Sequence, residues 1–273
     1  MPHIFTYRDA DLYSHHTVDH RPVPDEFSMH AHEWMEIFFF ISGQGSYLVE
    51  GTPYPLLPGD ILIMRAAETH TLTISPDQPY ERIAFHFSPS LLAEIDPQGR
   101  LLRPFLDRPL GQRNYYPASA DPEGRLRAAF SGFCFDGIPD VKLNLLARLL
   151  LFLTTLDGLY EQSRMYHFSP QSLQGQLIAY VNEHLFHNIS LQTVADHFYR
   201  SRSQISRVFQ QATGSPLWQY VTIKRLMAAR AMIQRGETAS TACISCGFSD
   251  YSSFFRAYRA HFGHAPKEDV TRS

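Results

Sequence analysis

The chain of 273 residues is 44% hydrophobic, which is enough for two domains that each bury a core. Its formal net charge of -3 does not suggest a nucleic-acid partner, but the charge is unevenly spread. Residues 170–273 hold 11 Lys or Arg and 6 Asp or Glu, whereas the remainder holds 13 and 21. We therefore expect a basic module that meets phosphates, joined to an acidic one that does not. The N-terminus lacks the apolar run of a signal peptide, and we find no stretch of roughly 18 apolar residues, so we expect a cytoplasmic protein without a membrane partner.

Residues 1–120 have the pattern of an antiparallel β domain. Short apolar runs such as EIFFFISG, SYLVEG and DILIM are separated by Gly, Pro and Ser turn signals. The spacing HxHxxxExxxxxxG runs from His30 to Gly43, and Gly59 is followed by His70 in a second segment. These two segments resemble the paired motifs of the cupin barrel, although the second lacks the usual Pro and Gly. Residues Met1–Tyr13 could form an arm that closes over the barrel.

The cupin resemblance implies a small barrel whose mouth binds a small molecule. Four side chains would converge there and suit a divalent first-row metal: His30, His32, Glu36 and His70. The alternative is that they bind a polar effector without metal. Three aromatic side chains are further candidates for effector binding, by stacking on a sugar ring, or for simple core packing: Trp34, Tyr47 and His86.

Residues 121–168 are expected to be a helical linker and dimerisation region. From Val141 the run VKLNLLARLLLFLTTLDGLYEQ has apolar residues at helical spacing, with Arg148 and Asp157 on the other side. By default the apolar stripe is core, and it comprises Leu145, Leu149, Phe152, Leu153 and Leu156.

Residues 169–273 contain two helix-turn-helix patterns, Ser190–Ala212 and Ser240–His261, joined by a long helix. Ser190 and Ser201 stand where N-caps are needed, Gln204 completes a capping box, and Ser249 is the expected cap in the second unit. A rigid connecting helix would hold the two recognition helices about one DNA turn, roughly 34 Å, apart.

The outward faces of the two recognition helices predict the DNA contacts. Arg can grip guanine with two hydrogen bonds in the major groove, so Arg207 and Arg256 are the leading candidates. The predicted base contacts are Ser203, Gln204, Ser206, Arg207, Tyr251, Ser252, Phe255 and Arg256. The predicted phosphate contacts, which position the protein without reading sequence, are Arg200, Arg202, Lys224, Arg225 and Arg259.

The runs LxxVAxxF, SxxQISRVFQxxTGxSPxxYVxxxRLxxAxxMI and CGFSDYSSFFRAYRAHFGHAP resemble the AraC/XylS-type bacterial transcription regulators over about 100 residues. The resemblance implies an α+β multidomain chain: an N-terminal antiparallel cupin-like barrel with flanking helices, and a C-terminal all-α domain of two helix-turn-helix units. It also implies a homodimer, a sugar-like effector and, for an activator, contact with RNA polymerase. Asp269 and Val270 replace the family's usual closing aromatic and Arg.

Two other functions compete with a ligand-controlled activator. One is a cupin metalloenzyme with an accessory DNA-binding domain, which we disfavour because catalysis would destroy the signal that a sensor must hold. The other is a regulator controlled by a protein partner, with an unused barrel. We expect no catalytic residues.

Overall fold

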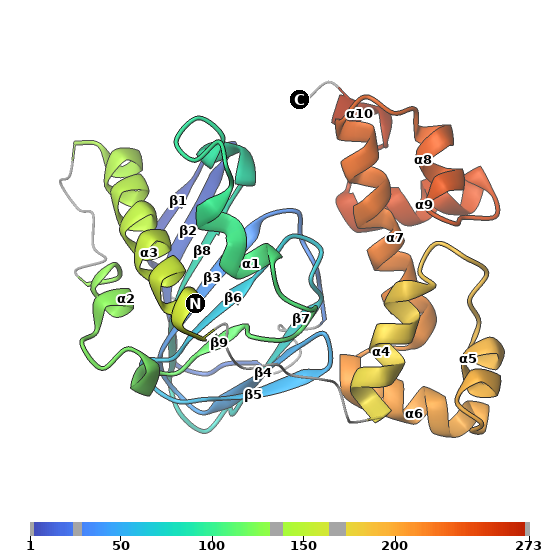
Figure 1. Cartoon of the computed structure of the whole chain (residues 1–273), viewed down its shortest axis with the longest axis horizontal. Helices are drawn as coiled ribbons and strands as arrows, with labels where there is room; N and C mark the ends of the chain where they lie inside the picture. The colour runs from blue at the N-terminus through green and yellow to red at the C-terminus, as the bar shows by residue number, and fades with distance from the viewer. Residues whose placement is uncertain (1–2, 24–28, 132–138, 164–172, 271–273) are drawn as a thin grey trace.

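The computed structural model describes residues 3–23, 29–131, 139–163 and 173–270. A domain of strands with a few helices lies beside a second domain built only of helices (Figure 1). This arrangement confirms the predicted fold class, an antiparallel barrel followed by a helical module.

The N-terminal domain is built from two antiparallel sheets. The larger sheet has the order β1-β2-β8-β3-β6-β9, and the smaller has the order β5-β4-β7. The bounds are β1 His3–Arg8, β2 Leu12–Asp19, β3 Met35–Ser42, β4 Gly45–Val49, β5 Thr52–Leu56, β6 Ile61–Met64, β7 His70–Ile74, β8 Tyr80–Phe87 and β9 Tyr115–Tyr116. An isolated antiparallel bridge between His30 and His70 joins the segment before β3 to the start of β7. The prediction that Met1–Tyr13 forms an arm over the barrel is wrong for the described part of this segment. Strand β1 instead pairs along β2 as part of the larger sheet.

Alternation along the strands gives the larger sheet two faces with different roles. Its inner face meets the smaller sheet, and there Phe38 and Phe40 pack with Tyr47 and Leu72. Its outer face carries other apolar side chains such as Ile37, which pack against helix α3, Val141–Ser163. Short helical segments complete this layer: η2 Pro89–Leu92, η3 Arg100–Leu102, α1 Arg103–Leu106, η4 Ala118–Ala120 and α2 Arg125–Ala128.

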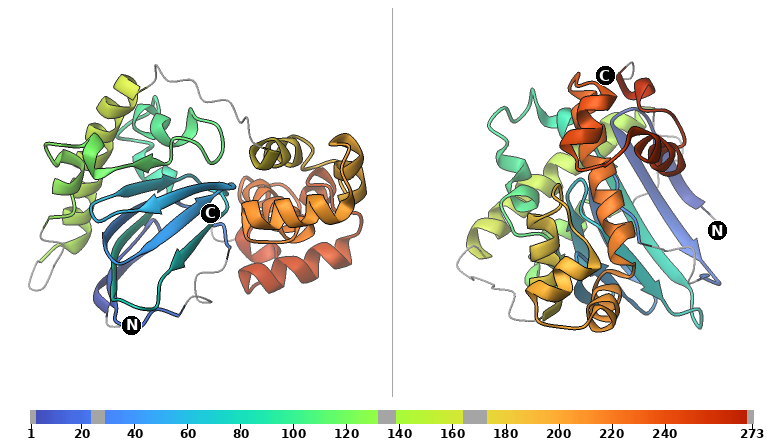
Figure 2. Two further views of the ribbon diagram at one scale, coloured as in Figure 1. Left: turned by 90° about the horizontal axis from the view of Figure 1, so that it is seen from below. Right: turned by 90° about the vertical axis from the view of Figure 1, so that its right-hand side faces the viewer.

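Helix α3 packs on the outside of the barrel and shares a core with the larger sheet. The five residues of its predicted stripe are buried on the outer face of the larger sheet, on the side of the barrel away from the helical domain (Figure 2). Asp157, expected on the solvent side, is instead buried and paired with Arg100 and Arg103. By length and mean hydropathy alone α3 could cross a membrane, although Arg148 and Asp157 interrupt its apolar residues. Packing against the sheet accounts for its buried stripe, whereas Leu143 and Leu151 on the same helix are exposed.

The helical domain holds both helix-turn-helix units around a long central helix. Its elements are α4 Leu173–Glu183, α5 Leu191–His197, α6 Arg202–Thr213, α7 Leu217–Gln234, α8 Ala239–Ser245, α9 Tyr251–Phe262 and α10 Lys267–Val270. Helix α7 runs between the group α4, α5, α6 and the group α8, α9, α10 (Figure 1). The first unit has its predicted buried residues, Ile205 and Phe209, in one core, and the second has Phe254 and Tyr258 in another.

Caps define where the helices begin. Ser190 caps α5, and Ser201 with Gln204 forms the predicted capping box of α6. The prediction that Ser249 caps the second recognition helix, α9, is wrong. Asp250 directly precedes α9 with extended backbone, and its Oδ1 accepts the N–H of Ser253 at 2.7 Å, whereas Ser249 lies one residue too early.

The turn inside each unit needs a left-handed residue. Gly247 has φ 79° in the second unit, and Tyr199 has φ 53° at the corresponding turn of the first. Glycine adopts this conformation freely, while a tyrosine there is strained. The Tyr199 side chain is 93% exposed, so packing does not explain its presence.

Candidate functional site

Three imidazoles converge on one carboxylate at one end of the barrel interior. The Nε2 atoms of His32, His70 and His86 lie 2.9, 3.3 and 3.5 Å from Oε2 of Glu36. Glu36 and His86 are directly opposed on β3 and β8, whereas His70 begins β7 of the other sheet. We call these four residues the imidazole cluster.

Backbone carbonyls fix the orientation of two of the rings. The Nδ1–H of His32 donates to the carbonyl oxygen of Trp34 at 2.9 Å, and that of His70 donates to the carbonyl oxygen of Glu68 at 2.8 Å. A ring held in this way turns Nε2 toward Glu36: the protonated ring donates Nε2–H to the carboxylate, and the neutral ring presents the Nε2 lone pair that a metal would take.

Burial and mutual charge set the protonation of the cluster. Burial alone would raise the pKa of Glu36, but the charge of His86 and hydrogen bonds from the three imidazoles hold that pKa well below its usual range. Burial lowers the pKa of His32, because its hydrogen bond to Glu36 only partly offsets desolvation. Burial also acts against a charged His70, yet the hydrogen bond and charge of Glu36 raise its pKa. Glu36 is therefore an ionised carboxylate although its side chain is buried.

The other predicted pocket residues lie around the cluster in different roles. His30 is exposed, and its ring centroid lies 4.3 Å from that of His70. The hydroxyl of Tyr47 donates to Oε1 of Glu36 at 3.5 Å. The predicted metal quartet is thus divided between two triads that share His32: one adds His30 and His70, and the other adds Glu36 and His86.

Sequence reasoning included His86 of β8 but missed the contribution of β2 to the same interior. Tyr13 lies opposite His86 in the sheet and stacks on it, with ring centroids 5.3 Å apart. His15 and Thr17 follow on the same face at intervals of two residues. Within the described residues, Thr17 Oγ1 and His86 Nδ1 are buried without a hydrogen-bond partner. The alternation in LYSHHTVD was the available signal, but only the strand pairing shows that this face points inward.

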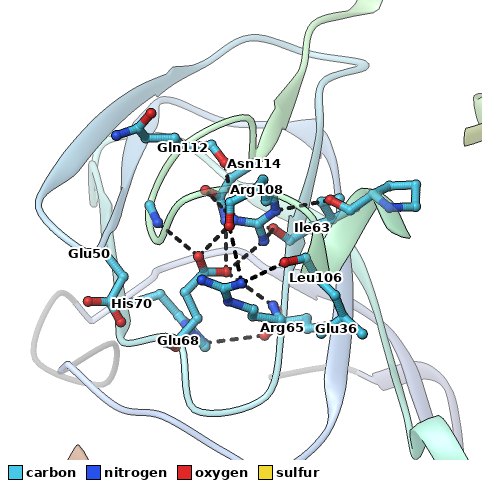
Figure 3. A network of polar contacts seen from close by, with 12 residues as sticks. Glu36, Glu50, Ile63, Arg65, Glu68, His70, Leu106, Arg108, Gln112 and Asn114 are labelled. Atoms are coloured by element: carbon cyan, nitrogen blue, oxygen red, sulfur yellow. Dashed lines mark hydrogen bonds and ion pairs between the residues drawn. The ribbon is translucent and has the colours of Figure 1, made fainter. Parts of the chain in front are cut away.

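A buried ion pair supports the loop beneath His70. The side chains of Arg108 and Glu68 are fully buried and meet through two N–H···O bonds of 2.8 Å (Figure 3). Glu68 also accepts the backbone N–H groups of Arg65 and Gly111. Because the carbonyl of Glu68 holds the ring of His70, this network fixes one member of the imidazole cluster.

The helical domain presents the predicted DNA-reading faces. Among the predicted base contacts Ser203, Arg207, Tyr251, Ser252 and Arg256 are exposed, and Ser206 and Phe255 are half-buried. Gln204 is exposed, but its side-chain oxygen accepts the N–H of Ser201 within the capping box. The predicted phosphate contacts Arg200, Arg202 and Arg259 are exposed. The placement of these residues as DNA contacts stays a prediction.

Two predicted phosphate contacts do not agree with the structure. Lys224 is buried, and its ammonium group pairs with Glu50 of the barrel. Arg225 donates to the carbonyl oxygens of Leu185, Gly247 and His187 at 2.7, 2.5 and 2.6 Å. Both cations are therefore committed to protein partners, which a count of charges in the sequence could not reveal.

A barrel with a buried polar cluster at one end of its interior, joined to two helix-turn-helix units, defines a two-domain DNA-binding regulator. An AraC-like ligand binding domain matches residues 19–128, and a helix-turn-helix domain matches residues 194–272. The chain is an AraC/XylS-type transcription regulator.

Relatives of similar length support this assignment. The chain is 23% identical over 255 residues to the HTH-type transcriptional activator RhaS of Escherichia fergusonii, covering 89% of this chain and 87% of the relative. It is 24% identical over 271 residues to RhaS of Enterobacter sp. (strain 638), covering 93% and 95%. Among solved structures, ToxT from Vibrio cholerae O395 is similar with a TM-score of 0.41 and 12% identity, covering 97% of this chain and 98% of that one.

Proposed function

We propose that the protein binds a small polar effector in the barrel, at the imidazole cluster, and that this binding controls its action on DNA. The observation that carries the proposal is the buried polar interior itself. Glu36, Tyr47 and His86 face one another inside the barrel, Thr17 lies four residues beyond Tyr13 on the same face of β2, and buried polar groups require partners. A hydroxyl-rich molecule such as a sugar could supply both donors and acceptors to them.

The output we propose is activation. The RhaS relatives are transcriptional activators by name. We further propose that this protein is a cytoplasmic homodimer and that it recruits RNA polymerase to paired DNA sites. A barrel that senses must bind and release its ligand unchanged, so no catalytic step is proposed.

A divalent cation is a second candidate for the ligand. The specific observation is that His32 and His70 donate Nδ1–H to carbonyls and turn Nε2 toward Glu36. Imidazole nitrogen with one carboxylate suits Zn²⁺, Ni²⁺ or Cu²⁺. His86 fits the donor set that includes Glu36 better than His30 does.

A thermal-unfolding screen tests both ligands. A compound that binds only the native state should stabilise it by about 2.7 kcal/mol at one hundred times its dissociation constant. We expect a shift with a sugar or sugar acid, or with Zn²⁺ in a chelator-sensitive way. His86→Ala should reduce the shift, whereas His16→Ala should retain it, since His16 pairs with Glu81 on the opposite face of the sheet. An equal loss in both variants, or no response to any compound, would count against the barrel as sensor.

Base reading by the two exposed arginines can be tested separately. Replacing Arg207 or Arg256 with alanine should cost about 1–3 kcal/mol of binding at the preferred site and relax the sequence preference there. Binding of each variant to the preferred site and to random DNA gives the comparison. An equal loss on both DNAs would reassign that arginine to phosphate.

A further inference from the structure

The wall of the imidazole cluster is also the surface on which the DNA-binding domain docks. His30 and His70 exchange two backbone hydrogen bonds of 3.0 Å, and Ala67 N–H donates to the carbonyl oxygen of His32 at 2.8 Å. The neighbours Met29 and Ala31 are buried in the core of the first helix-turn-helix unit, and Ala67 packs against that core. The two chain segments that carry the histidines therefore have the ligand site on one side and the helical domain on the other.

Glu50 anchors α7 to this wall. It occupies the turn between β4 and β5, is 4% exposed, and accepts the N–H of Thr69 through Oε1 at 2.6 Å. From α7, the ammonium of Lys224 pairs with Oε1 of Glu50 and the hydroxyl of Tyr220 donates to Oε2. Lys224 also donates to the carbonyl oxygen of Ala67 at 2.7 Å. We call Glu50, Tyr220 and Lys224 the latch.

Two further contacts define how closely the domains approach. Gly51, with φ 80°, lies so near the helical domain that a Cβ would overlap Ile178 Cδ1 and lie 3.0 Å from the carbonyl oxygen of Ala212. At the other end of α7, Arg230 and Gln234 reach Glu33 at 3.3 and 3.0 Å. Glu33 directly follows His32 in the chain, so the contact that Arg230 and Gln234 make with the barrel also lies next to a member of the imidazole cluster.

We propose that the latch is a regulatory contact: it holds the DNA-binding domain on the wall of the imidazole cluster, so that a change at His70 is transmitted to α7. The path is short, because Thr69 precedes His70 and donates to Glu50, which holds Lys224 and Tyr220. Glu50, Tyr220 and Lys224 lose one another together when the domains separate, and water then replaces all of these contacts at once, which favours an all-or-none change over a gradual one. The proposal rests on the proposed sensor function in one respect only, namely that effector binding at the imidazole cluster is the event that changes the latch.

Amine labelling of the full-length protein, read by mass spectrometry, tests the latch without any ligand. Lys224 should label about tenfold more slowly than the exposed Lys267 in the wild type, since it reacts only when the domains part. Gly51→Ala should raise the labelling of Lys224 toward that of Lys267. Gly99→Ala is the matched control, because Gly99 also has positive φ, at 66°, but has open space around it.

A second pair of variants tests the connection to the cluster. His70→Ala, or His70→Gln if the first variant does not fold, should also raise the labelling of Lys224, while His16→Ala should leave it as in the wild type. Rapid labelling of Lys224 in the wild type, or no response to Gly51→Ala, would overturn the latch. A response to Gly51→Ala but none to either His70 variant would overturn the coupling. These outcomes are independent of the ligand screen, because a protein that bound no tested compound would still protect Lys224.

Discussion

Replacing Arg108 with alanine is expected to lower the free energy of unfolding by about 3–5 kcal/mol, because it leaves Glu68 charged, buried and without its main partner. The Arg108 guanidinium also donates to Asn114 at 3.1 Å and to the carbonyl oxygens of Pro104 and Ile63. No water can replace these bonds cheaply at a side chain with 0% exposure. The same change frees the loop under His70, so any response to ligand should weaken as well.

Urea unfolding at neutral pH measures this effect. Arg125→Ala provides the control, because Arg125 pairs with Glu123 at 2.7 Å but both side chains are more than two-thirds exposed. Exposed pairs of this kind contribute little to stability, because water screens the two charges. A similar small loss for Arg108→Ala would show that the buried pair is not a major source of stability.

The pH dependence of this loss gives an independent check. Burial acts to raise the pKa of Glu68, but the charge and hydrogen bonds of Arg108 lower it to about 2, from 4.5. A folded-state pKa below the unfolded value means that the stabilisation is fully present above about pH 4.5 and is lost as the pH falls toward 2. The difference in unfolding free energy between wild type and Arg108→Ala should therefore shrink over that range.

The sequence was most informative where local rules decide the structure. Hydrophobic spacing and capping chemistry located both helix-turn-helix units, and Ser190 and Ser201 cap the helices as predicted. Cap prediction failed at Ser249 because a second capping residue, Asp250, follows it immediately. Asp269, which departs from the family pattern, is buried and accepts from Arg230 and Tyr258. An aspartate in that place is thus supported by partners that are distant in the sequence.

The site was predictable only in part, because its other half depends on strand pairing. The spacing from His30 to Glu36 was visible in the sequence, and the structure brings His32 and Glu36 together as expected. Tyr13 and His15 join them only through the register of β2 on β8. The contact between Glu50 and Lys224 joins residues 174 positions apart, so no local pattern could identify it.

Arg225 is expected to fix the spacing between the two helix-turn-helix units, and Arg225→Ala should lower the free energy of unfolding by about 1.5–3 kcal/mol, the range for hydrogen bonds to a charged group. Its guanidinium holds the carbonyls of Leu185 and His187, before the first unit, and of Gly247 in the turn of the second. Arg225→Lys should not restore stability, because one ammonium group cannot bond three carbonyls in a fixed plane. Arg235→Ala, which removes an exposed charge from the end of the same helix, should change stability by less than about 0.5 kcal/mol.

DNA binding distinguishes this role from the phosphate contact that the sequence suggested. A lost phosphate contact weakens binding to all sequences about equally and reduces the salt slope by about one. If Arg225 instead fixes the spacing of the two units, Arg225→Ala should weaken binding to the full target, which engages both recognition helices at once. The salt dependence of its binding to random DNA should then equal that of Arg235→Ala. Titrations of both variants on both DNAs at several salt concentrations separate the two roles. A reduced salt slope for Arg225→Ala alone would mean that its guanidinium leaves the three carbonyls when DNA binds.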